Sequence, residues 1–132
     1  MRKQISPSAV AFVFLLFVVA ASAQYAGWTI PEGGKDEKSP LKPTADVLRK
    51  GKSLFQGNCQ KCHGPEGKGD GPDSKEPAAD LTDDFRTPLN PDGILYYKVW
   101  NGHPPAMPAH KSKLSKDEVW TVVEYIKTLR KP

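Results

Sequence analysis

The sequence predicts an all-α protein with three or more helices joined by long loops. Apolar residues recur at helical spacing in three segments, 44–56, 90–101 and 115–129. No segment alternates apolar and polar residues convincingly enough to predict a half-buried strand. The connections between the three segments are long and rich in Pro and Gly, which favour turns and loops.

The first helix is predicted to begin at Thr44, a suitable N-cap that follows Pro43. Gly51 lies inside this helix, where a glycine costs about 1 kcal/mol relative to Ala. A close crossing of another helix at this point would explain the glycine. The apolar residues that define the helix are Val47, Leu48, Leu54 and Phe55.

Two further helices are marked by their ends. Asn90 followed by Pro91 predicts the start of one helix, with the asparagine as its N-cap, and Gly102 predicts its end. Ser115 and Glu118 have the spacing of a capping box at the start of the last helix. The apolar stripe of that helix contains Val119, Val122, Val123, Ile126 and Leu129.

The N-terminal residues 1–23 have the layout of a secretory signal, with a short basic start and small residues before a cleavage point after Ala23. The apolar run at 9–21 is shorter than the about 20 residues of a membrane span. An uncleaved anchor starting near Ile5 is the alternative. We therefore predict an exported, periplasmic protein whose helical domain occupies residues 44–132.

Residues 24–43, called the N-terminal arm below, are rich in Pro, Gly and Lys and show no helical or strand period. Three apolar side chains are unusual for a solvated linker, because such groups usually seek cover. They leave two alternatives open, an arm that docks on the helical domain and a plain linker. These residues are Trp28, Ile30 and Leu41.

The charge pattern gives no support to a nucleic-acid partner. The whole chain has a formal net charge of +4, with 19 basic and 15 acidic residues. Cleavage after Ala23 would remove two basic residues and leave a net charge of +2. Basic and acidic residues are interspersed, and there is neither a basic stripe nor a nucleic-acid-binding motif.

The chemistry of the chain centres on its two cysteines, Cys59 and Cys62, with His63 directly behind the second. A disulfide between them would close too small a loop to constrain the unfolded chain much. A structural zinc ion normally needs four protein ligands, and only His103 and His110 could complete the set. A thioredoxin-like dithiol requires a βαβ setting, which the sequence lacks.

The Cys-x-x-Cys-His spacing instead matches covalent haem attachment. Two intervening residues let the sulfurs of Cys59 and Cys62 reach the two vinyl groups of one porphyrin, and the imidazole of His63 then reaches the iron. Because the motif occurs once, we predict one covalent haem c, with His63 as the proximal iron ligand.

The chain resembles the class I c-type cytochromes over about residues 44–131. The likeness rests on the early helix with its glycine, the Cys-x-x-Cys-His motif, a Gly-rich loop, the Met107-Pro108 pair and an aromatic last helix. The resemblance implies the small cytochrome c fold, in which the first and last helices cross near Gly51 against an aromatic such as Tyr125. It also implies that a proline carbonyl after the haem motif supports His63, and Pro72 and Pro77 both qualify.

The resemblance also points to Met107 as the sixth iron ligand, because the family takes this ligand from a methionine before a proline. Met107 is the only methionine outside the predicted signal. His103 and His110 lie on the same loop and are the competing ligands. A His/His iron would have a lower reduction potential than a His/Met iron.

The predicted function is one-electron transfer rather than catalysis, with a transient redox partner. Four lysines are candidates for guiding an acidic partner. A membrane would be involved only through partner complexes or an uncleaved N-terminus. The alternative is a peroxidase-like or ligand-binding haem protein with a labile sixth ligand. The candidate lysines are Lys61, Lys98, Lys111 and Lys113.

Overall fold

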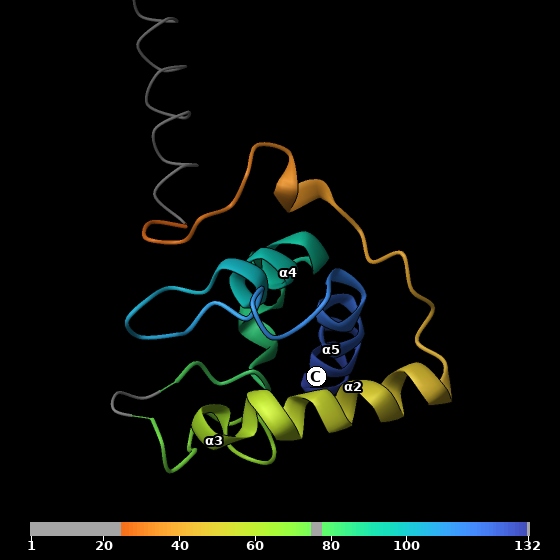
Figure 1. Ribbon diagram of the computed structural model, residues 1–132, viewed down its shortest axis with the longest axis vertical. Helices are drawn as coiled ribbons and strands as arrows, with labels where there is room; N and C mark the ends of the chain where they lie inside the picture. The colour runs from red at the N-terminus through yellow and green to blue at the C-terminus, as the bar shows by residue number, and fades with distance from the viewer. Residues whose placement is uncertain (1–24, 75–77, 132) are drawn as a thin grey trace, which may run out of the picture.

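The computed structural model describes residues 25–74 and 78–131, so the predicted signal at 1–23 lies outside the described residues. Within those two ranges the regular structure is helical, without a β-strand, and the predicted all-α fold is confirmed (Figure 1). No helix in these ranges is long and apolar enough to cross a membrane. The elements are η1 (Gly34–Asp36), α2 (Ala45–Asn58), α3 (Gln60–His63), η2 (Asp84–Leu89), α4 (Asp92–Asn101) and α5 (Lys116–Leu129).

The frame of the fold is the crossing of α2 and α5, which Figure 1 shows in yellow-green and dark blue. Gly51 lies at the crossing, where a Cβ atom would come 2.5 Å from the Thr121 carbonyl oxygen and 2.7 Å from Cβ of Tyr125. The rings of Phe55 and Tyr125 pack beside it, with centroids 5.4 Å apart. The predicted close crossing at Gly51 is therefore confirmed.

Helix α5 supplies more buried apolar side chains than any other described helix. Ser115 accepts a hydrogen bond from the Glu118 amide at 3.2 Å, and the Glu118 carboxylate accepts one from the Ser115 amide at 2.9 Å, which confirms the capping box. Its predicted apolar stripe faces inward, with Val119, Val122 and Val123 fully buried.

Helix α4 starts differently from the prediction. Pro91 occupies the N-cap position and makes no side-chain cap, so the assignment of Asn90 as the cap is wrong. The Asn90 side chain instead donates to the Arg86 carbonyl at 2.9 Å and accepts from Lys98 Nζ at 2.7 Å. These partners compete for the side chain and orient it away from the helix terminus. The helix ends before Gly102, as predicted.

The N-terminal arm packs along α4 before it turns down to the start of α2 (Figure 1). Glu37 holds the arm twice, because its carbonyl accepts from the Gly93 amide at 3.1 Å and its carboxylate accepts from the Tyr97 hydroxyl at 2.6 Å. At the other end of α4, the Asn101 side chain donates to the Thr29 carbonyl at 2.8 Å. Of the two alternatives for the arm, docking on the helices is therefore confirmed.

Candidate functional site

A cavity lies where α3, η2, α4 and α5 meet the arm and the 102–115 loop. Three of the four predicted haem-site residues, Cys59, His63 and Met107, line it together although the sequence separates the first from the last by almost fifty positions. The rest of its apolar wall is formed by Trp28, Ala79, Leu81, Leu95, Val99 and Ile126. Its polar wall is formed by Asp80, Asp83, Arg86, Thr87, Asn90, Lys98 and Arg130.

The Cys-x-x-Cys-His motif follows the C-terminus of α2 directly, and α3 begins one residue after Cys59. The Cys59 amide still donates to the Phe55 carbonyl at 2.8 Å, and the short helix α3 then carries Cys62 and His63. The Gly-rich loop returns onto α3, where the Gly71 amide donates to the Cys62 carbonyl at 3.0 Å. A Cβ atom on Gly71 would collide with the backbone of α3, so the close return requires glycine.

The thiols do not have the properties of a redox dithiol. Cys59 is 7% exposed, and burial together with the neighbouring Cys62 raises the pKa of its thiol to about 12. A reactive dithiol needs the opposite shift, since the thiolate is the nucleophile. Both cysteines are free thiols, and the described residues contain no group of three or more His, Cys, Asp or Glu side chains placed to hold a metal ion.

His63 is held in one orientation by a backbone carbonyl. Its Nδ1 lies 3.1 Å from the Ala79 carbonyl oxygen. A carbonyl only accepts, so Nδ1 carries the proton and the lone pair of Nε2 is available to the cavity. Burial lowers the pKa of His63, although the Ala79 bond acts in the opposite direction, and the ring is therefore neutral at pH 7. The expectation that Pro72 or Pro77 supplies this carbonyl is wrong for Pro72, and Pro77 lies outside the described residues.

Met107 reaches the cavity from a narrow loop. The His103 amide donates to the Met107 carbonyl at 2.8 Å, and the Met107 amide donates back to the His103 carbonyl at 3.0 Å. This pair of bonds closes the loop around its prolines and fixes the methionine side chain as part of the wall. The thioether sulfur is a soft, uncharged donor, and as an iron ligand it would favour the ferrous state.

Neither competing histidine lines the cavity. The His103 ring packs on Trp28, with centroids 5.1 Å apart. His110 is 5% exposed, and its Nδ1 has no hydrogen-bond partner among the described residues. Burial lowers the pKa of His110, and Lys113, His63 and Lys61 add to this effect, so the ring is neutral at pH 7.

Two half-buried cations, Lys98 and Arg130, meet at Asn90 and are called the cavity cations below. Lys98 Nζ donates to the Asn90 side chain at 2.7 Å, and an Arg130 guanidinium nitrogen donates to the Asn90 carbonyl at 2.8 Å. No carboxylate of the described residues lies within ion-pair distance of either cation. Burial lowers the pKa of Lys98, and nearby Arg86 lowers it further.

The donor set fits a covalent haem. The thiol of Cys59, the oriented imidazole of His63 and the thioether of Met107 line one cavity, and the second thiol, Cys62, lies directly before His63 on α3. The cavity cations are unpaired within the described protein, although an isolated buried charge is costly. The two carboxylate side chains of a haem would neutralise them. The residues that would hold the group are therefore Cys59, Cys62, His63 and Met107, with the cations as counter-charges.

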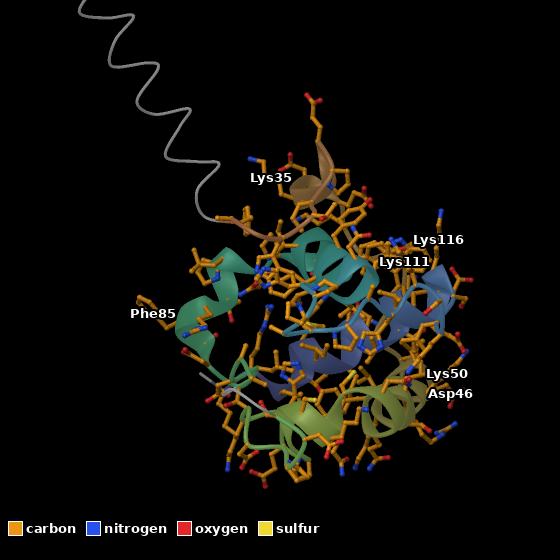
Figure 2. All side chains as sticks on the ribbon, turned by 60° about the vertical axis from the view of Figure 1, so that its left-hand side comes forward. Lys35, Asp46, Lys50, Phe85, Lys111 and Lys116 are labelled. Atoms are coloured by element: carbon orange, nitrogen blue, oxygen red, sulfur yellow. The ribbon has the colours of Figure 1, made fainter. Side chains whose placement is uncertain are left out.

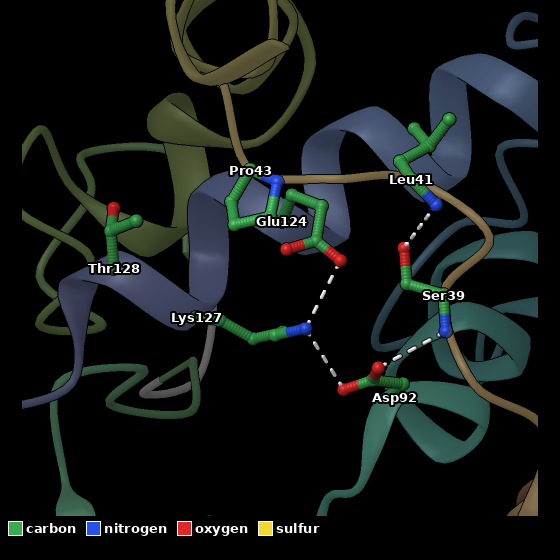
Figure 3. Close-up of a pocket in the computed structure, with 7 residues that line it drawn as sticks. All are labelled: Ser39, Leu41, Pro43, Asp92, Glu124, Lys127 and Thr128. Carbon is green, nitrogen blue, oxygen red and sulfur yellow. Dashed lines mark hydrogen bonds and ion pairs between the residues drawn. The ribbon is translucent and has the colours of Figure 1, made fainter. Parts of the chain in front are cut away.

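A second hollow, between the arm, α4 and α5, lacks such unpaired groups (Figure 3). Lys127 lies between Glu124 and Asp92, at 3.0 and 3.2 Å, and Asp92 also accepts from the Ser39 amide at 3.1 Å. We call Asp92, Glu124 and Lys127 the paired charge network. Every charge in this network has a partner within the chain. The network links the arm to α4 and α5 and therefore has a structural role.

The residues that surround the centre of the cavity were not predicted from the sequence. Lys98 was expected on the surface, but it lines the cavity, and Ala79, Asn90 and Arg130 were not expected to contribute. The burial of Lys98 could have been predicted from its position in the helix, because it directly precedes the apolar Val99. For Ala79 no local signal exists, because a backbone carbonyl carries no sequence information.

Comparisons with known proteins identify a matching family and a relative. The family model described as "Cytochrome c" matches residues 48–130. The cytochrome c6 of Chlorolobion braunii is 34% identical over 79 residues, which cover 60% of this chain and 86% of that protein.

Two solved structures have the same fold. A chain of the reducing HAO-like protein complex of Kuenenia stuttgartiensis has a TM-score of 0.61 and 30% identity, with 70% of this chain and 47% of that chain covered. Cytochrome cL of Methylophaga aminisulfidivorans has a TM-score of 0.58 and 27% identity, with 68% of this chain and 58% of that chain covered. This chain therefore spans about half the length of these two solved chains.

Proposed function

The chain belongs to the cytochrome c family, whose members carry electrons on covalently bound haem c, and we propose that it is an exported one-electron carrier with a single haem and His/Met ligation. Cys59 and Cys62 form the two thioether bonds, and His63 and Met107 are the axial iron ligands. The observation that carries the proposal is the meeting of Cys59, His63 and Met107 on one cavity.

Bound haem supplies an iron that exchanges one electron between its ferrous and ferric states. The protein contributes a fixed ligand geometry, because the Ala79 carbonyl orients the ring of His63 and the His103–Met107 backbone bonds fix the opposite loop. Met107 favours the ferrous form, since a thioether donates less charge than an imidazole. The buried apolar side chains of the wall, Leu95, Val99 and Ile126, would limit the access of water to the iron.

Both axial positions being filled leaves no open coordination site for a substrate. This arrangement favours electron transfer over the alternative of a peroxidase-like or ligand-binding haem protein. His103 and His110 do not reach the cavity wall, which supports Met107 as the sixth ligand.

The partner is another redox protein that docks transiently. Lys61, Lys111 and Lys113 are exposed and make no ion pair with a described residue, and they suit an acidic partner. Lys111 and Lys116 are labelled on the same side of the molecule in Figure 2. The solved relative from Kuenenia stuttgartiensis is part of a protein complex, which is consistent with a partner.

Export is supported by the signal layout of residues 1–23, with cleavage after Ala23. Covalent attachment of haem also requires that both thiols remain unreacted until the haem binds. The high pKa of Cys59 reduces such side reactions, because only the thiolate is strongly nucleophilic.

The test of the proposal is Met107→Ala in the haem-loaded protein. We expect the ferric protein to lose the weak long-wavelength absorption band of an iron–thioether bond. The reduction potential should fall, and carbon monoxide should bind the ferrous iron rapidly, because the sixth site is open.

Matched controls are His103→Ala and His110→Ala, which remove the competing histidines of the same loop. Both should keep the band, the potential and the closed site. A Met107→Ala variant with an unchanged band and slow carbon monoxide binding, together with loss of the band in either histidine variant, would overturn His/Met ligation.

A further inference from the structure

The N-terminal arm contributes a wall of the cofactor cavity although the family model begins to match only at residue 48. Trp28 is half-buried and is the arm residue that lines the cavity. Its backbone is fixed by a turn, in which the Trp28 amide donates to the Tyr25 carbonyl at 2.9 Å. The next residue is tied to α4 by the bond from the Asn101 side chain to the Thr29 carbonyl.

The indole ring of Trp28 lies between two groups of the helical domain. The His103 ring packs against it, with centroids 5.1 Å apart, and Lys98 Nζ lies 4.9 Å from its centroid. The second distance is within the range of a cation–π interaction. Trp28 therefore covers the cavity at the place where Lys98 enters it.

The polar groups around Lys98 are neutral or positive at close range. Lys98 Nζ contacts the Asn90 amide oxygen and the Trp28 ring, and it lies 5.9 Å from the centroid of the Tyr25 ring. The carboxylates on the cavity wall are already engaged elsewhere. Asp83 forms an ion pair with Arg86 at 3.4 Å, and Asp80 accepts from Thr82.

Arg130, like Lys98, has no carboxylate of the described residues within ion-pair distance. Burial lowers its pKa, while Asp92 and Asp84 act in the opposite direction from beyond ion-pair distance. Holding two cations on one asparagine is unfavourable unless an anion joins them. The wall carboxylates Asp80 and Asp83 are not within ion-pair distance of either cation, whereas a haem would bring two further carboxylates into the cavity that both cations border.

We propose that the arm completes the haem site: Lys98 and Arg130 bind the carboxylate side chains of the haem, and Trp28 closes the cavity over them. The inference rests on the proposed function, because it requires a haem in the cavity. It adds a role for three residues outside the thioether and axial positions. The arm then excludes water from the buried ion pairs, which strengthens them.

The first test is Lys98→Met in the haem-loaded full chain, which removes the charge and keeps an apolar stem. A nearby positive charge favours the ferrous state, so the reduction equilibrium constant should fall by about tenfold, a change of about 59 mV for one electron. Lys98→Arg should restore the wild-type potential. The control is Lys116→Met, the same charge change at an exposed site without a proposed role, and it should move the potential much less (Figure 2).

The second test is Trp28→Ala, with Ile30→Ala as the matched control in the same arm. Opening the wall should lower the reduction equilibrium constant severalfold and should accelerate reduction by a small neutral reagent. Trp28→Leu and Lys98→Gln are measured in parallel, so that a variant that fails to fold has a milder substitute at the same position.

The outcomes separate the two proposals. A wild-type protein without covalent haem contradicts the proposed function itself. A wild-type protein with covalent haem and an iron–thioether band, in which the Lys98 and Trp28 variants have the same potentials as their controls, contradicts only the role of the arm. Potentials that fall in the Lys98 and Trp28 variants but not in the controls support it.

Discussion

The cavity cations and the paired charge network are two groups of half-buried charges built from neighbouring parts of α4, α5 and the residues that follow them. In the paired charge network, Lys127 neutralises Glu124, which is 2% exposed, and also Asp92. At the cavity, Lys98 and Arg130 share the oxygens of Asn90 and have no carboxylate partner among the described residues. Charges that are all paired within the chain indicate a structural role. Half-buried charges without a partner in the chain indicate that a ligand supplies the opposite charge.

The same contrast extends to the uncharged groups. The cavity presents an imidazole nitrogen with an available lone pair, a thioether and the thiol of Cys59, whereas the charged residues in Figure 3 already bind one another. Removal of a residue at the cavity should therefore change the properties of the cofactor. Removal of a residue from the paired charge network should change the stability of the fold and leave the cofactor as it was.

The largest effect is expected for the double variant Cys59→Ser/Cys62→Ser. It cannot form thioether bonds, and the emptied cavity would leave its apolar wall exposed to water. We expect loss of covalent haem and loss of a cooperative thermal transition, measured by haem staining after denaturation and by circular dichroism. A double variant that melts like the wild type would show that the cavity is stable without its cofactor.

Gly51→Leu tests the helical frame that both charge groups share. Its side chain would collide with Thr121 and Tyr125, and overpacking typically costs about 1–3 kcal/mol. The free energy of unfolding in denaturant should fall, while the haem spectrum of the folded fraction should stay the same.

The control for this prediction lies on the same helix. A methyl group at Gly57 would point into open space, so Gly57→Ala should raise the stability by about 0.5–1 kcal/mol. Equal effects at the two glycines would mean that α2 and α5 do not cross at Gly51.

Lys127→Met sharpens the contrast between the two charge groups. It leaves the buried Glu124 without its ion-pair partner, and we expect a loss of about 1–2 kcal/mol in the free energy of unfolding. Lys50→Met, at an exposed site on α2, is the control and should have little effect. The reduction potential of both variants should match the wild type, and a large shift for Lys127→Met would remove the distinction between structural and ligand-binding charges.

The smallest effect concerns acid stability through Asp92. Burial alone would raise the pKa of Asp92, but the Ser39 amide and Lys127 outweigh burial and hold the pKa below its usual value. A depressed carboxyl pKa stabilises the fold above the usual value of about 4 and loses this contribution as the pH falls through the lower, folded-state value. Stability measured from pH 6 to 2 should therefore decrease less steeply in Asp92→Asn than in the wild type.

The helical frame could be predicted from the sequence because its signals are local. The capping box of Ser115 and Glu118 and the apolar stripe of α5 depend on residues three or four positions apart, and Gly51 is conspicuous within its own helix. Asn90 was misassigned because its tertiary partners Arg86 and Lys98 outweigh its preference for an N-cap.

The centre of the cavity was also predictable, since Cys59, Cys62 and His63 form one contiguous motif and Met107 follows from the family resemblance. The surroundings were not, because they depend on contacts between distant segments. Trp28 meets Lys98 and His103 across about seventy positions of sequence, and neither a period nor a motif links them. The carbonyl of Ala79 reaches His63 through the path of a loop rather than through a side chain.

The most direct test of the account is the mass of the mature protein after acid–organic extraction, which removes haem that is not covalently bound. The account predicts a mass equal to that of residues 24–132 plus one haem, with the haem remaining on the peptide that contains Cys59 and Cys62 after proteolysis. A mass equal to that of the bare polypeptide would contradict it, because the cavity would then have been built around something other than a covalently attached haem.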